Sequence, residues 1–294
     1  MDASIKSRPH TYFDVSTDAS EEQKTADSFF DRQVTLFISM LKHVFRLDNT
    51  NTIFDYGCGG KGNLFFDIAS RKDVIDSYRI VYYGYDVITF DIQKDEFYKY
   101  IDLFANENKD FRYVFLDDVS MHAIKSISLD SSINVIVVKN VMHEVDLSKF
   151  EECFKFINEI LMSGGYLFII DQMMLKNHEP SGVAWHYQDI EELVCGILGY
   201  TSLPVFKHVD MILEEYEDEN FRTPFYILGF QKVSELHVSN ASALIQEFAL
   251  NSQRKRIDFV NTQLMPSNKT NELLSMIYLH EMKQIKIQLS RINS

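Results

Sequence analysis

Short apolar runs that end in a polar or acidic residue recur along most of the chain, and helix-compatible stretches separate them. Runs of this kind are typical of the buried strands of an α/β domain, and the stretches between them predict crossover helices. Seven runs are present, which predicts a doubly wound sheet of seven strands. The predicted strands are residues 53–55, 79–86, 111–118, 133–139, 166–171, 205–213 and 225–230.

Helical signals divide the chain into three parts. Ser20 and Gln23 form a capping box, and apolar residues at helical spacing predict a helix from there to about Leu47. Further helices are predicted at residues 63–71, 147–162 and 185–198, and two or three more lie beyond residue 233. We therefore expect a helical segment at 1–46, an α/β domain at 47–233 and a helical extension at 234–294.

Composition and charge exclude several classes of protein. The net charge of −14 opposes non-specific binding to nucleic acid, which depends on neutralising phosphates. No secretory signal or membrane-spanning run is visible, so we expect no membrane association. Three scattered cysteines without metal spacing favour free thiols and the cytoplasm, and they predict no metal site.

The C-terminal extension differs in charge from the rest of the chain. Residues 250–294 hold seven basic and three acidic residues, so they carry +4 while the remainder carries −18. This asymmetry predicts that the tail packs on the acidic body of its own chain or of a partner, which would form a homodimer through the C-terminal helices. Two differently charged, solvated faces are the alternative.

A glycine-rich turn after the first strand is the strongest candidate for chemistry. Gly57, Gly59 and Gly62 match the spacing of a dinucleotide-binding loop, in which a pyrophosphate sits on a helix N-terminus. Asp55 lies two residues before the first glycine, and its carboxylate would repel a pyrophosphate but attract the ammonium group of an amino acid. A tight strand–helix turn without a ligand is the third interpretation.

The stretch Asp55-Tyr56-Gly57-Cys58-Gly59 resembles motif I of the class I S-adenosylmethionine (SAM)-dependent methyltransferases. The resemblance covers about residues 20–233. It implies a Rossmann-like sheet of order 3-2-1-4-5-7-6 whose last strand is antiparallel, an N-terminal helical lid and SAM as the cofactor. For the N-terminal helix, simple packing on the sheet is the alternative to a lid. One departure is Lys61, which stands where the family usually has its third glycine.

The same resemblance assigns residues to the cofactor. Asp86 ends the second strand, where an acid accepts the ribose hydroxyls, and a helix N-cap is its alternative role. Asp117, or its neighbour Asp118, ends the third strand, where an acid meets the adenine amino group. The cofactor-binding residues implied in this way are Asp55, Gly57, Cys58, Gly59, Asp86, Val87, Asp117, Asp118 and Asn140.

The residues after the fourth strand are candidates for catalysis. Asn140-Val141-Met142-His143-Glu144 resembles the corresponding segment of many small-molecule and O-methyltransferases. His143 is the candidate general base, with Glu144 as its orienting or alternative partner. The competing interpretation is a structural histidine whose hydrogen bonds are satisfied within the strand–helix turn. Candidate substrate-lining residues are Tyr12, Trp185, His186 and Tyr187. For Trp185, packing on the core at the start of an amphipathic helix is the alternative.

These signals favour a SAM-dependent methyltransferase that acts on a small molecule, with oxygen as the expected acceptor atom. Three alternatives stay open. The chain could be a non-catalytic or regulatory methyltransferase-like subunit, an RNA or protein methyltransferase that docks through its basic tail, or a nicotinamide-dependent enzyme. The carboxylate of Asp55 is the main evidence against the last of these.

Overall fold

The computed structural model describes most of the chain from residue 36 onward. The described residues are 36–58, 63–69, 71–86, 111–117, 132–174, 182–211, 214–215, 221–222, 224–233, 241–265 and 272–292. The chain divides into two compact units, residues 1–44 and residues 45–294. In the first unit, a helix covers residues 36–44 and ends three residues before the predicted end at Leu47. Its predicted start at Ser20 lies outside the described residues.

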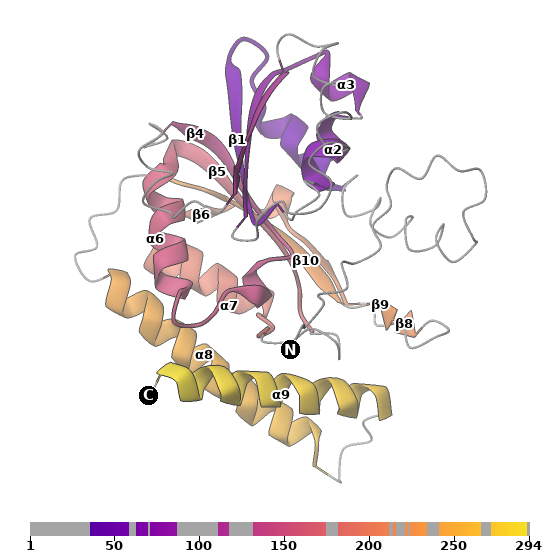
Figure 1. The fold of residues 1–294 in the computed structure, drawn as a ribbon, viewed down its shortest axis with the longest axis vertical. Helices are drawn as coiled ribbons and strands as arrows, with labels where there is room; N and C mark the ends of the chain where they lie inside the picture. The colour runs from indigo at the N-terminus through magenta and orange to yellow at the C-terminus, as the bar shows by residue number, and fades with distance from the viewer. Residues whose placement is uncertain are drawn as a thin grey trace. The chain divides into compact units, whose positions relative to one another are not determined.

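The second unit is built on one large sheet (Figure 1). Its strand order is β3-β2-β1-β4-β5-β10-β6, and β7 also pairs with β10. Strands β1 to β5 run parallel, whereas β10 is antiparallel to its neighbours. This arrangement confirms the predicted order, with β10 as the seventh strand. The bounds are β1 Thr50–Tyr56, β2 Arg79–Asp86, β3 Phe111–Asp117, β4 Ile133–Lys139, β5 Leu161–Gln172, β6 Thr201–Ser202, β7 His208–Asp210 and β10 Phe225–Gln231.

The sixth strand, predicted at residues 205–213, is formed among the described residues only at β7, and the short strand β6 lies before the predicted range. β6 and β7 each pair with β10, and a 3-10 helix η3 (Pro204–Phe206) lies between them. Pro204 opens η3, where its fixed φ suits the first position of a helix, so residues 205 and 206 of the predicted strand lie in this 3-10 helix. Part of the acidic stretch that follows forms a separate small hairpin, β8 (Glu214–Glu215) with β9 (Phe221–Arg222).

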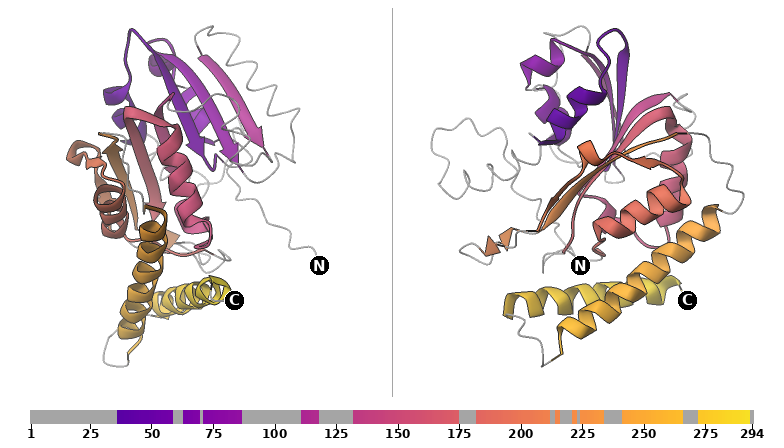
Figure 2. Two further views of the ribbon diagram at one scale, coloured as in Figure 1. Left: turned by 90° about the vertical axis from the view of Figure 1, so that its left-hand side faces the viewer. Right: turned by 180° about the vertical axis from the view of Figure 1, so that it is seen from behind.

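Helices cover both faces of the sheet (Figure 2). On one face, α2 (Asn63–Ala69) packs Phe65 edge-on against Tyr82 of β2. α3 (Lys72–Ile75) follows directly, beyond the predicted end of the helix at residue 71. On the other face lie α6 (Phe150–Ile160), α7 (Tyr187–Glu191) and the π-helix η2 (Glu192–Ile197).

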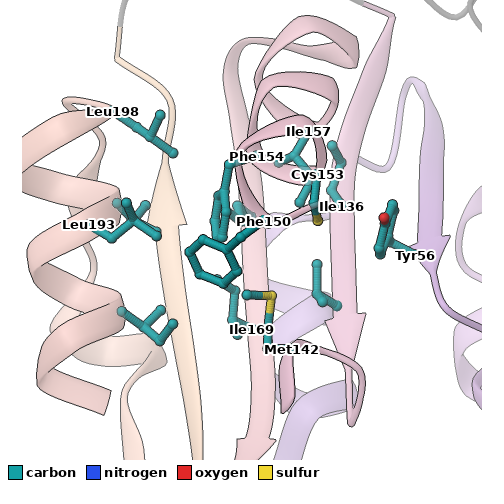
Figure 3. Close-up of a cluster of buried hydrophobic side chains, with 14 of the residues drawn as sticks. Tyr56, Ile136, Met142, Phe150, Cys153, Phe154, Ile157, Ile169, Leu193 and Leu198 are labelled. Carbon is teal, nitrogen blue, oxygen red and sulfur yellow. The ribbon is translucent and has the colours of Figure 1, made fainter. Parts of the chain in front are cut away.

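The main hydrophobic core lies between the sheet and α6 (Figure 3). α6 is strongly amphipathic, and its buried face includes Phe150, Phe154 and Ile157. These side chains pack on Ile136 and Ile169 of the central strands. The alternation of buried and exposed positions along α6 therefore orients it on the sheet and places its N-terminus beside the ends of β4 and β5.

α6 ends earlier and β5 begins earlier than the sequence predicts. The helix stops at Ile160, and β5 starts at Leu161, which pairs with Ile133 of β4. The ammonium group of Lys232 donates to the carbonyl oxygens of Asn158 (2.6 Å) and Leu161 (2.8 Å). A lysine at this place satisfies the last carbonyls of the helix, so no glycine cap is needed there.

Two long helices form the C-terminal extension, as predicted. α8 (Ala241–Gln263) contacts α6, η2 and α9 (Glu272–Ile292) (Figure 2). Both helices bury polar side chains in addition to apolar ones. The buried polar residues of the pair are Ser252, Gln253, Arg256, Glu281, Gln284 and Gln288. Within the described ranges, none of the helices is both long and apolar enough to cross a bilayer.

Candidate cofactor and catalytic site

The carboxyl ends of the parallel strands bring the predicted acidic residues to one edge of the sheet. Tyr56 at the end of β1 lies opposite Tyr85 of β2, and Asp86 at the end of β2 lies opposite Asp117 of β3. Ligands of open α/β sheets bind outside this edge, where the strand order reverses between β1 and β4. The register therefore places Asp55, Asp86 and Asp117 in neighbouring strands at the expected position.

Asp55 is a buried carboxylate with one oxygen left unsatisfied. Its side chain is 1% exposed, and the hydroxyl of Tyr82 donates to Oδ2. Oδ1 is buried and has no hydrogen-bond partner among the described residues. Burial raises the pKa of Asp55 to about 7, although the Tyr82 hydrogen bond and Lys139 oppose this rise. A buried carboxylate oxygen without a partner fits a cationic ligand group, such as an ammonium.

Gly57 begins the turn after β1 in a conformation that favours glycine. Its φ is +77°, and its N–H and that of Cys58 both donate to the carbonyl oxygen of Tyr85 (2.7 and 3.0 Å). A Cβ at position 57 would lie 2.2 Å from Cγ2 of Val141. The turn is thus held against β2 on one side and against the segment after β4 on the other.

Replacing Gly57 with alanine is expected to destabilise the protein by about 3 kcal/mol, because a left-handed backbone and a steric clash add together. Gly164→Ala is the matched control, since Gly164 also has a φ of +77° but no atom lies within 4 Å of its added Cβ. It should cost only about 1 kcal/mol. Urea unfolding measures both variants, and equal losses would show that the contact with Val141 relaxes freely.

Two further predicted cofactor residues lie close to Asp55 and Gly57. Asp86 is 7% exposed at the end of β2. Cys58 is also buried, and burial together with the charges of Asp55 and Asp86 raises the pKa of its thiol. Cys58 therefore stays protonated at neutral pH and acts as a small apolar wall instead of a nucleophile.

His143 lies in a 3-10 turn, η1 (Met142–Glu144), directly after β4, and its side chain is fully buried. Nδ1 of its ring is 2.5 Å from Oδ1 of Asp171, and its backbone N–H donates to Oδ2 of the same carboxylate (3.1 Å). Because a carboxylate accepts, this contact places the proton of a neutral imidazole on Nδ1 and leaves Nε2 with its lone pair. A base oriented by a buried acid is the arrangement that general-base catalysis requires.

Asp171 is the contact partner of His143 that the sequence did not single out. It lies near the end of β5 and is 1% exposed. The predicted orienting partner, Glu144, has a side chain that is 57% exposed, and its Oε1 lies 3.6 Å from Nε2 of His143. The acid that closes the fifth strand was visible in the sequence, but only the adjacency of β4 and β5 brings it to His143. Tyr226 of β10 lies opposite Asp171 in register.

Asn140 joins β4 to the His143 turn. Its φ is +55°, a region that asparagine tolerates better than most residues. The backbone N–H donates to the carbonyl oxygen of Ile170 (2.7 Å), and the buried Oδ1 has no hydrogen-bond partner within the described ranges. Asn140 therefore turns the chain across the strand edge and presents a free acceptor there.

The predicted substrate wall needs one correction. Trp185 is 1% exposed and stacks on Phe150 at 4.4 Å between ring centroids, so it is a core residue and not an open wall. His186 accepts a hydrogen bond from Arg256 of α8, and the ammonium of Lys207 lies over the ring of Tyr187. The substrate roles of His186 and Tyr187 stay predictions.

Several predicted positions cannot be placed. Tyr12, Gly59, Val87 and Asp118 lie outside the described residues, and for Asp117 only the backbone position is described. Among the residues that are described, no group of three or more His, Cys, Asp or Glu side chains has an arrangement that would hold a metal ion.

Known proteins are similar to the chain in structure, whereas the two sequence-based comparisons found no match. No family model matches the sequence, and no curated protein matches it. A SAM-dependent methyltransferase from Methanosarcina mazei is 15% identical, with 66% of this chain and 97% of that chain covered and a TM-score of 0.43. A putative methyltransferase from Bacillus halodurans C-125 is 13% identical over 68% and 99% of the two chains, with a TM-score of 0.43.

A third similar structure is the CMeT domain of the citrinin polyketide synthase, which is 13% identical over 74% of this chain and 58% of that chain, with a TM-score of 0.45. With TM-scores below 0.5, these similarities do not establish the function of the chain.

Proposed function

We propose that the chain is a SAM-dependent methyltransferase that acts on a small molecule, with oxygen as the acceptor atom. The observation that carries the proposal is Asp55, a buried carboxylate whose Oδ1 has no partner among the described residues, two residues before the glycine turn. An amino-acid ammonium satisfies such an oxygen, whereas a phosphate would be repelled by it. SAM carries that ammonium.

The residues at the strand ends fit the remaining parts of the cofactor. Asp86 would accept the ribose hydroxyls, and Asp117 or Asp118 with Val87 would meet the adenine. Gly57, Cys58 and Gly59 would line the methionine part, and Asn140 Oδ1 offers a further acceptor beside it. When bound, SAM supplies a methyl group that its sulfonium already activates, so the protein has mainly to orient the acceptor and exclude water.

His143 is the proposed general base for a hydroxyl acceptor. Asp171 fixes its tautomer through the 2.5 Å contact with Nδ1, which leaves Nε2 to take the acceptor proton. Glu144, close to Nε2, is placed to receive or relay that proton. In this mechanism Asp171 orients the base and stabilises the imidazolium that forms, while His143 moves the proton.

Calorimetry with SAM tests the cofactor assignment. Asp86→Ala is expected to weaken binding about 100-fold, because two hydrogen bonds from ribose hydroxyls to a charged group are lost. Asp76→Ala is the matched control, since Asp76 is an exposed acid just before β2 and should leave affinity unchanged. Unchanged binding by Asp86→Ala would refute the ribose assignment, and absence of binding by the wild-type protein would refute the proposal.

One observation favours a second candidate, a SAM-binding subunit without turnover. The side chain of His143 is 0% exposed, so an acceptor can reach Nε2 only if the surrounding residues move. A panel of small hydroxyl compounds, assayed for S-adenosylhomocysteine release, separates the two. Product formation that His143→Gln abolishes supports the enzyme, whereas SAM binding without product for any acceptor favours the subunit.

The predicted homodimer through the C-terminal helices also stays a prediction. An open groove of about 380 Å³ on α9 supports it. Apolar atoms form most of its surface, and two basic residues flank them. The lining residues are Leu279, Met282, Lys283, Lys286, Ile287 and Ser290. A cytoplasmic location has the free thiols of Cys58, Cys153 and Cys195 as its support.

A further inference from the structure

The C-terminal helix α9 holds the segment that directly follows the His143 turn. The backbone N–H of Leu147 donates to Oε1 of Gln288 at 2.8 Å, and both residues are buried. At the surface, Nη1 of Arg291 lies 3.4 Å from Oδ2 of Asp146. A side chain that is 141 positions away in sequence thus supplies the hydrogen-bond acceptor for this stretch of backbone.

The helix α8 holds a second segment that touches His143. The N–H of Val183 donates to the carbonyl oxygen of His143 at 2.8 Å, so Val183 lies directly beside the turn and begins the segment 183–186. Nε2 of Gln253 donates to the carbonyl oxygen of Ala184 at 3.4 Å, and Nη1 of Arg256 donates to Nε2 of His186. Both neighbours of the turn are therefore tied to the extension by side chains.

A buried ion pair locks the two helices to each other at this place. Nε and Nη2 of Arg256 contact Oε1 and Oε2 of Glu281 at 2.6 and 3.0 Å, and both side chains are buried. Burial and the charge of Arg256 lower the pKa of His186 to about 4, which keeps this histidine neutral and able to accept the hydrogen bond. Buried pairs of this kind contribute little net stability, but they can fix one relative placement of two elements.

We propose that α8 and α9 form a positioning brace for the His143–Asp171 pair, with Gln288 and Arg256 as its positioning residues. The role of this brace in catalysis rests on the proposed function. Asp171 fixes the ring of His143, while the backbone of the turn is held by β4 before it and by the brace after it. Such bracing matters because misplacing a catalytic group by about 1 Å can reduce the rate about 100-fold.

The experiment measures how fast protons at the turn exchange with solvent in the full-length protein. Nuclear magnetic resonance of the uniformly ¹⁵N-labelled protein reports the backbone amides of Leu147 and Val183 and the Nδ1–H proton of His143, which the loss of its signal in His143→Gln assigns. Gln288→Ala removes the acceptor on α9. Arg256→Lys keeps a charge beside Glu281 but loses the planar fork that also reaches His186. Both variants are expected to speed exchange of this proton and of the Leu147 and Val183 amides at least tenfold.

Ile285→Val is the control, because it trims a fully buried residue of α9 without removing a hydrogen bond. Tenfold faster exchange in the two variants but not in the control supports the brace. Exchange that is unchanged, or that rises equally in the control, overturns it. The two variants act on different helices, so failure of one to fold leaves the other informative. SAM calorimetry on the wild-type protein tests the proposed function separately, and its failure would leave the exchange result intact.

Discussion

Asp55→Asn is expected to weaken SAM binding about 100-fold at pH 7.5. The asparagine can still accept the Tyr82 hydrogen bond, but it carries no charge for the cofactor ammonium. A charge-assisted hydrogen bond in a buried site contributes roughly 1.5–3 kcal/mol, and the lost Coulomb attraction adds to it. Isothermal calorimetry measures the difference directly.

A second ligand makes this test specific. 5′-Methylthioadenosine has the ribose and adenine of SAM but no amino-acid part, so its affinity should be the same for wild-type protein and Asp55→Asn. A loss for both ligands would mean that the variant distorts the whole site. Equal SAM affinity in the two proteins would show that Asp55 does not meet the ammonium, and the cofactor assignment would then have no support at its central residue.

The same substitution is expected to stabilise the ligand-free protein above pH 7. Burial raises the pKa of Asp55 from 3.8 to about 7, so between these two pH values the folded state keeps a proton that the unfolded state has lost. The contribution of Asp55 to the free energy of unfolding is therefore complete below pH 3.8, declines as pH rises, and is lost above pH 7. The loss is of the order of 4 kcal/mol, at 1.36 kcal/mol per pKa unit.

Urea unfolding of wild-type protein and Asp55→Asn at pH 5 and pH 8 isolates this effect, because the other ionisable groups are common to both. The difference between them should grow with pH. The SAM affinity of the wild-type protein should rise with pH where the stability of its ligand-free form declines. It should fall up to tenfold per pH unit below a midpoint near pH 7, since a protonated Asp55 cannot pair with an ammonium. The Tyr82 hydrogen bond lowers the pKa of Asp55, so Tyr82→Phe should move the midpoint of this pH dependence of SAM affinity to higher pH. Tyr83→Phe on the same strand should leave the midpoint unchanged.

The sheet was predictable because its strands are continuous runs of apolar residues in the sequence. β2 and β4 begin and end where the sequence predicts, since continuous apolar residues followed by a polar end identify a strand buried on both faces. The predicted boundaries are wrong where contacts between residues far apart in the sequence determine the end of an element. The α6–β5 boundary depends on pairing of Leu161 with Ile133 and on Lys232 from beyond β10, and neither contact leaves a local signal.

The candidate site was predictable only in part. Residues at the ends of successive strands converge by topology, so Asp55, Asp86 and the His143 segment could be grouped from sequence alone. Asp171 belongs to the same pattern, yet its role depends on which neighbour its side chain faces. Asp171 was given no role, whereas Trp185 was given a substrate role that its burial contradicts. An aromatic residue at a helix start suits a ligand wall and a core equally well. The buried polar residues of α8 and α9 have no periodic signature.

The broken edge made by β6 and β7 has a consequence for solubility. β10 has six consecutive buried residues, Phe225–Phe230, and a bare edge of this kind would recruit strands from other molecules. The short strands and the intervening η3 turn cover it, and Phe206 fits against Gly229, where any Cβ would collide with it. Because β6 and β7 are only two and three residues long, neither is long enough to template another strand, and we expect this edge of the sheet to resist edge-to-edge aggregation.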